Sequence, residues 1–185
     1  MPSSPQTPVF QLQTIDPERY RRETRRSSLI VLLSFAVLAM NCATLTVHLF
    51  DDPQQGSVVW NLLGVLLGLL ITALLVRTVY WSLPWMASAR YGWRLKRCLM
   101  RIGNAMHRLE RAEAAGDPEA LRILRFYHLG VDQMQTLEGG GRLDDDTDPL
   151  RKRVLASLHA RGLVPEQTRF EAHWDAHLKR LPAAD

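Results

Sequence analysis

Two long runs without a charged side chain constrain this sequence more than any other feature. The first covers residues 29–50 and the second covers residues 57–76. At about 1.5 Å per residue, a helix of either length spans roughly 30 Å, the thickness of the hydrocarbon core of a bilayer. Two such runs do not fit the core of a 185-residue soluble protein. We therefore predict two transmembrane helices joined by a short turn at residues 51–56.

The average composition conceals these runs. A mean hydropathy of −0.12, with 46% hydrophobic and 23% charged residues, is typical of a soluble domain. The counts of 11 Gly and 10 Pro exclude a collagen-like chain, and 2 Cys exclude a disulfide scaffold. The averages combine an apolar hairpin with a much more polar remainder.

The positions of the basic residues predict the orientation. Five arginines precede residue 29, no Lys or Arg lies in residues 29–76, and the rest of the 23 bases follow. Because basic residues favour the inner side of a membrane, both termini are expected in the cytoplasm and the 51–56 turn outside. A cleaved signal peptide is not expected, since the segment before the first span is 28 residues long.

Three Asp-Pro pairs predict helix starts, at Asp16-Pro17, Asp117-Pro118 and Asp148-Pro149. The expected fold is all-α: a two-helix transmembrane hairpin with a cytoplasmic helical-hairpin or bundle domain. Its parts are a tail and basic pre-span helix (1–28), the spans and turn (29–50, 51–56, 57–76), an aromatic interfacial elbow (77–89), an amphipathic helical hairpin (90–138), a Gly/Asp linker (139–148) and C-terminal helices (149–181). Phe10 and Leu12 suggest an extended piece docked on the rest.

A basic amphipathic helix is predicted over residues 90–115. Five arginines share one face at about 100° per residue, with apolar residues on another face. They are Arg90, Arg94, Arg97, Arg101 and Arg108. This face is expected to contact anionic lipid headgroups, or else an acidic partner protein. Nucleic acid is not an expected partner, because no recognition module accompanies the charge.

Small residues mark one face of the second span. Gly64, Gly68 and Thr72 allow close backbone approach, either to the first span of the same chain or to a second copy in a homodimer. Asn41 lies near the middle of the first span, where an amide needs a partner. It is expected to form an interhelical hydrogen bond, and the alternative is a place along a transport path.

Two patterns resemble metal sites but do not complete one. His173 and His177 are one helical turn apart, yet Trp174 stands where the metalloprotease signature needs Glu, and a third ligand is not evident. The aspartates at 144, 146 and 148 lack the Gly and Glu of a calcium loop. We predict no metal and no cofactor.

The remaining reactive residues also favour structural roles. His107 and His128 come from the two predicted hairpin helices and are expected to be polar core residues. Cys42 and Cys98 fall in different compartments, so a disulfide between them is not expected and both are interpreted as buried thiols. Because phosphate loops and nucleophile motifs are absent from the sequence, we do not expect an enzyme.

Four segments together resemble a known group of proteins: residues 10–30, 60–77, 91–102 and 114–130. They resemble an uncharacterised family of short bacterial two-span inner-membrane proteins, a domain of unknown function, over residues 10–138. The resemblance implies a bacterial inner-membrane location. It brings no activity, cofactor or catalytic residue.

The sequence therefore favours a non-enzymatic inner-membrane protein that presents a cytoplasmic helical domain to a partner or to itself. One alternative is a small oligomeric channel or transporter accessory subunit, with Asn41 lining the path. A second alternative is a membrane-bound metal-dependent enzyme that uses the histidines. Expected partners are anionic lipids, a second copy of the chain, or another membrane or cytoplasmic protein.

Overall fold

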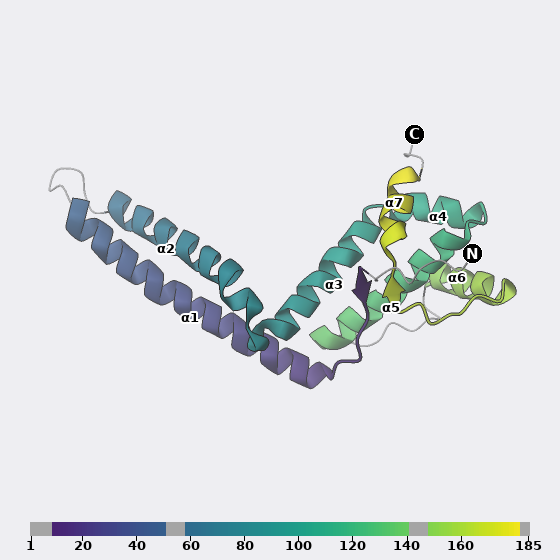
Figure 1. Ribbon diagram of the computed structural model, residues 1–185, viewed down its shortest axis with the longest axis horizontal. Helices are drawn as coiled ribbons and strands as arrows, with labels where there is room; N and C mark the ends of the chain where they lie inside the picture. The colour runs from purple at the N-terminus through teal and green to yellow at the C-terminus, as the bar shows by residue number, and fades with distance from the viewer. Residues whose placement is uncertain (1–8, 51–57, 141–147, 182–185) are drawn as a thin grey trace. The chain divides into compact units, whose positions relative to one another are not determined.

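The computed structural model describes residues 9–50, 58–140 and 148–181 (Figure 1). The chain divides into two compact units, which are described separately. We call residues 19–90 the hairpin unit, and residues 1–18 with 91–185 the helical unit. The predicted 51–56 turn, and the aspartates at 144 and 146 of the predicted linker, lie outside the described residues. The described elements are helical apart from two strands of two residues each, so the all-α prediction is confirmed.

The hairpin unit contains the two predicted long helices. Helix α1 (Pro17–Phe50) has its first two residues in the helical unit and then continues through the first uncharged run. Helix α2 (Val58–Thr78) lies alongside it (Figure 1). The predicted elbow consists of two short 3₁₀ helices, η1 (Tyr80–Ser82) and η2 (Pro84–Met86). Leu83 between them is extended because the residue before a proline disfavours the helical region.

The three predicted helix starts are confirmed. Helices α1, α5 (Pro118–Glu138) and α6 (Pro149–Ala160) each begin at the proline of an Asp-Pro pair. The preceding aspartate accepts a hydrogen bond from the backbone N–H two residues later, at 2.9 Å for both Asp117 and Asp148. The aspartate therefore satisfies one of the N–H groups that lack a partner within the helix.

Helix α5 is the centre of the helical unit. It contacts α4 (Met106–Ala114), α6, α7 (Ala172–Arg180) and strand β2 (Arg169–Phe170). Ala120 and Leu124 are completely buried on one side of this helix, and Ile123 and Phe126 are completely buried on another side. Neighbours on several sides cover α5, so it needs apolar residues around most of its circumference.

The predicted continuous helix over residues 90–115 is also corrected. Helix α3 (Ala87–Gly103) ends before α4 begins at Met106. At the break, the N–H of Ala105 donates to the carbonyl of Ile102 at 2.9 Å, three residues back instead of four. Gly103 and Asn104 are weak helix formers, so the chain can bend here. Ile102 and Leu109, on either side of the bend, are both fully buried.

A short antiparallel strand pair joins the N-terminal and C-terminal segments of the helical unit. Strand β1 (Phe10–Gln11) pairs with β2, with Phe10 opposite Phe170. The docked extended piece predicted at Phe10 and Leu12 is therefore confirmed. Strand β2, which contains Phe170, lies within the segment predicted as C-terminal helices (149–181), and the last helix starts at Ala172.

Candidate functional site

Gly64 and Gly68 lie in the seam between α1 and α2 of the same chain. A Cβ atom at Gly64 would come within 2.4 Å of Ala43 Cα, and one at Gly68 within 2.5 Å of Ala39 Cα. Both distances are shorter than real Cβ contacts, so these positions require glycine. Thr72, one turn further along, is buried and donates to the Gly68 carbonyl at 2.7 Å. The small-residue face therefore packs within the chain.

We expect Gly68→Leu to force α1 and α2 apart. The added side chain would meet Ala39 backbone atoms that cannot move aside, and overpacking of this kind costs about 1–3 kcal/mol. Spin labels at the exposed Leu45 and Leu62 would measure the separation in the purified full chain. Gly68→Leu should lengthen and broaden the measured distance distribution.

The matched control for this test is Ala73→Leu, which adds similar bulk at an exposed position of α2. It should leave the distance between the two labels unchanged. An unchanged distance in Gly68→Leu would contradict the tight seam.

Asn41 does not lie in this seam. It is exposed, and its Nδ2 donates to the Val37 carbonyl one turn earlier, at 2.7 Å. The hydrogen bond from α1 to α2 comes instead from Thr46, whose Oγ1 donates to the Trp60 carbonyl at 2.9 Å. Sequence reasoning did not select Thr46, although its position one turn beyond Ala43 places it on the same face.

Both long helices expose many large apolar side chains on their outer sides. In the most apolar window of each helix, only 6% of α1 and 17% of α2 is buried. Both helices are long and apolar enough to cross a membrane. Core helices of a soluble protein would be mostly covered instead.

Near the end of this hairpin, Glu23 of α1 connects to the start of α3. Its Oε2 accepts from the Ser88 hydroxyl at 2.5 Å, and Oε1 accepts from Arg19 Nε at 2.7 Å. The Ser88 hydrogen bond, followed by that of Arg19, holds the pKa of Glu23 below its ordinary value. The contact with Ser88 is therefore made to a carboxylate throughout the neutral range.

The five arginines predicted to form one lipid- or partner-binding face do not all lie free on the surface. In the helical unit, Arg101 Nη1 donates to both carboxylate oxygens of Asp175 on α7 at 2.6 Å. Arg108 Nη1 donates to the Leu181 carbonyl at 3.4 Å. In the hairpin unit, Arg90 Nη1 donates to the Trp81 carbonyl at 2.5 Å. Three of the five arginines therefore make contacts within the chain.

Arg94 and Arg97 are exposed, and Arg101 is exposed as well although it pairs with Asp175. The Arg97 guanidinium lies 5.1 Å from the centre of the Trp93 ring, and Trp93 itself is 48% exposed. Together with Val9 and Phe10 of the N-terminal segment they line a shallow depression of about 140 Å³. We call Trp93, Arg94 and Arg97 the α3 surface. It combines positive charge with an exposed aromatic ring.

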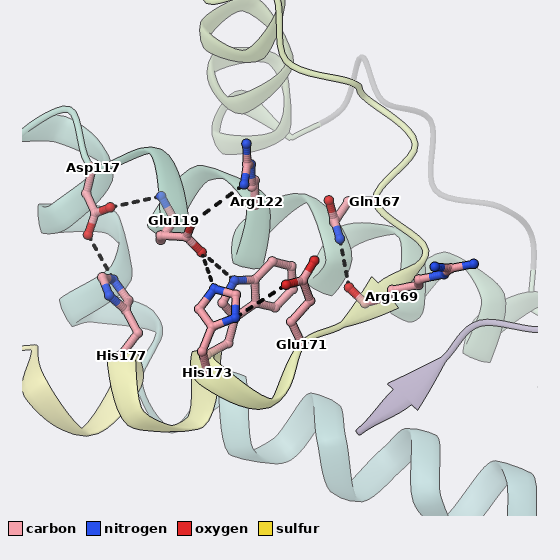
Figure 2. A network of polar contacts seen from close by, with 9 residues as sticks. Asp117, Glu119, Arg122, Gln167, Arg169, Glu171, His173 and His177 are labelled. Carbon is pink, nitrogen blue, oxygen red and sulfur yellow. Dashed lines mark hydrogen bonds and ion pairs between the residues drawn. The ribbon is translucent and has the colours of Figure 1, made fainter. Parts of the chain in front are cut away.

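The two histidines of α7 point to different carboxylates at the start of α5 (Figure 2). His173 Nε2 lies 3.0 Å from Glu119 Oε2, and His177 Nε2 lies 2.8 Å from Asp117 Oδ2. The indole N–H of Trp174 also donates to Glu119 Oε2, at 2.5 Å. These contacts attach α7 to α5.

The histidine pair therefore has a structural place in the helical unit. The described residues contain no group of three or more His, Cys, Asp or Glu side chains that could hold a metal ion. Of the two histidines predicted as polar core residues, only His128 is buried, at 3% exposed. His107 is exposed. Glu119 was missed by sequence reasoning because its partners on α7, His173 and Trp174, lie more than 50 residues later.

Cys98 is buried in the helical unit, and burial raises the pKa of its thiol to about 11. We expect alkylation by iodoacetamide at pH 8 to be about a hundredfold slower than in the urea-unfolded chain, because the reactive species is the thiolate. The measurement is mass spectrometry of a Cys42→Ala variant, in which Cys98 is the only thiol. Equal rates in folded and unfolded protein would contradict the burial of Cys98.

A comparison with protein families matches residues 10–174 to a family described as a protein of unknown function (DUF3087). The chain belongs to this family. Comparisons with curated proteins and with solved structures found no match. The match confirms the resemblance to a family described as a domain of unknown function and extends it beyond residue 138.

The extension of the family match includes β2 and the start of α7 as far as Trp174. These are the elements that pack on α5. They contribute His173, shown in Figure 2, and Trp174, whose indole N–H donates to Glu119. The segment after the predicted linker is therefore part of the family domain as well as of the helical unit.

Proposed function

We propose that the hairpin unit anchors the chain in the bacterial inner membrane, with both termini in the cytoplasm. The observation that carries this proposal is the exposure of large apolar side chains, including Val37 at 61%, Met40 at 74% and Leu70 at 67%. In water such a surface would be an aggregation hazard, whereas in a bilayer it is solvated by acyl chains. The distribution of bases around residues 29–76 supports the orientation.

The helical unit, in this proposal, is a non-enzymatic interaction module. Its exposed α3 surface fits anionic lipid headgroups, with an acidic protein as the alternative ligand. Each base near an anionic leaflet contributes about 1 kcal/mol, so Arg94 and Arg97 together contribute about 2 kcal/mol. That amount orients a domain that is already anchored but would not recruit a soluble one.

The rival functions are less well supported. Asn41 lies on the exposed side of α1, so a channel lined by Asn41 would need several copies of the chain. Conductance of reconstituted vesicles that is lost in Asn41→Leu would favour that channel. A stoichiometric metal in the purified protein would favour the enzyme.

The α3 surface is tested by a photo-crosslinking amino acid at Lys96, an exposed neighbour, in full-length protein in cells. We expect a defined lipid or protein adduct that falls severalfold in Arg94→Glu/Arg97→Glu. Arg101 is left unchanged in this test, because reversing its charge would break the contact with Asp175.

The control for this experiment reverses two other exposed bases of the helical unit, as Lys179→Glu/Arg180→Glu. That variant should keep the adduct. An adduct that is the same in all variants would contradict the role of the α3 surface.

A further inference from the structure

We propose that a second copy of the chain packs against a polar face of α1, formed by Asn41, Thr44 and His48. The inference rests on the proposed insertion of the hairpin into a membrane. All three side chains are exposed. We call these three residues the polar face.

The polar face points away from Ala39 and Ala43, the α1 residues of the seam, and at one edge it borders a groove shared with α2. At about 100° per residue, the three side chains fall within about 60° of one another, and the direction of Ala39 and Ala43 is about half a turn away. Thr44 and His48 also line a shallow groove of about 430 Å³ with Asn61 of α2, which is exposed as well. The polar groups of both helices therefore gather on the outer surface of the hairpin.

In a bilayer, this face is costly without a partner. Asn41 is 12 residues from the start of the uncharged run and 9 from its end. These separations put it roughly 18 Å and 14 Å from the two ends, too deep for the headgroup region. Its amide has two donors and an acceptor, and the bond to the Val37 carbonyl uses one donor. Hydrocarbon cannot satisfy the remaining groups.

A second copy of the chain fits this face by its chemistry. The Asn41 amide can still donate and accept, the Thr44 hydroxyl accepts while it donates to the Met40 carbonyl at 2.9 Å, and the His48 imidazole supplies a further donor. Two identical faces related by a two-fold axis therefore satisfy one another, without any opposite charge on the partner. The other face suited to self-association, at Gly64 and Gly68, is already occupied by Ala43 and Ala39 of the same chain.

Cysteine crosslinking in native membranes tests the proposal on the full chain with Cys42 and Cys98 replaced by Ala. Val37→Cys puts a thiol beside Asn41 on the polar face, at a position that is 61% exposed. The matched control is Leu70→Cys on the outer face of α2, which is 67% exposed. The two positions lie at the same depth because Gly68 packs on Ala39.

We expect oxidation to link Val37→Cys into a dimer at a yield at least severalfold above that of Leu70→Cys. Adding Asn41→Leu to the Val37→Cys chain should lower the yield about threefold to tenfold, the effect of one or two interhelical hydrogen bonds. Met40→Leu, a change at the adjacent exposed position, should leave the yield unchanged.

Three outcomes would overturn the proposal: equal yields at the two positions, no dimer at Val37→Cys, or crosslinks from Val37→Cys only to a different protein. Alkaline carbonate extraction of the same membranes distinguishes failure of the dimer proposal from failure of the proposed membrane anchor. A chain released by carbonate would reject both proposals. A chain that stays in the membrane but forms no dimer through Val37→Cys would reject only this one.

Discussion

Trp174→Ala is expected to destabilise the helical unit by about 3–5 kcal/mol, the range for truncating a buried tryptophan. Trp174 is 1% exposed. Its ring packs edge-on against Phe170 at 5.4 Å and against Phe126 at 6.5 Å between ring centres. Truncation would leave a cavity between α7, β2 and α5 and would remove the hydrogen bond to Glu119. Urea unfolding of the full chain, followed by the exposure of Cys98 to alkylation, measures the change.

Trp93→Ala is the matched control for this prediction, because it removes the same side chain from an exposed position of the same unit. It should change the free energy of unfolding by about 0.5 kcal/mol or less. Similar losses in the two variants would contradict the assignment of Trp174 to the core.

Asp132→Ala is expected to have an effect of comparable size, about 3–5 kcal/mol. Arg151 of α6 is 2% exposed, and its Nη1 lies 2.7 Å from Asp132 Oδ1 on α5. The same guanidinium also lies 3.5 Å from the His128 carbonyl and 3.9 Å from Asp148. Removing Asp132 takes away a countercharge that lies 2.7 Å from a buried cation. The same urea experiment measures the loss.

The double variant Asp132→Leu/Arg151→Met separates the charge from the packing. It replaces both charged groups with apolar side chains, so no charged group of this pair is left buried without its partner. We expect it to recover most of the stability that Asp132→Ala loses. A double variant as unstable as Asp132→Ala would contradict the electrostatic explanation.

The elements specified by local sequence could be predicted. An Asp-Pro pair contains both the capping acceptor and the residue suited to the first helical position, so the starts of α1, α5 and α6 followed from adjacent residues. The two long apolar helices followed from the length of the uncharged runs.

The packing of the helical unit could not be predicted in the same way. A helical wheel of residues 90–115 shows five arginines on one face but not their partners. Asp175 is 74 residues from Arg101, and Leu181 is 73 residues from Arg108. Strands β1 and β2 have two residues each, too few for an alternating pattern. These contacts depend on how α7 folds back, which no local pattern contains.

The seam of the hairpin illustrates a further limit of sequence patterns. The spacing of Gly64 and Gly68 predicts close helix packing, but it is the same for a partner within the chain and for a second copy. The approach of Ala43 and Ala39 is what identifies the intramolecular partner. The same geometry places Asn41 on the outer side of α1, where the sequence alone predicted a bond between the helices.

The central claim, a membrane hairpin with both termini in the cytoplasm, is tested most directly by cysteine accessibility in cells. In the chain with Cys42 and Cys98 replaced by Ala, Gln54→Cys lies between the two long helices and Ala184→Cys lies near the C-terminus. With the outer membrane permeabilised, a membrane-impermeant maleimide should label Gln54→Cys in intact cells. It should label Ala184→Cys only after the inner membrane is disrupted. Labelling of Ala184→Cys in intact cells, with Gln54→Cys protected, would contradict the account.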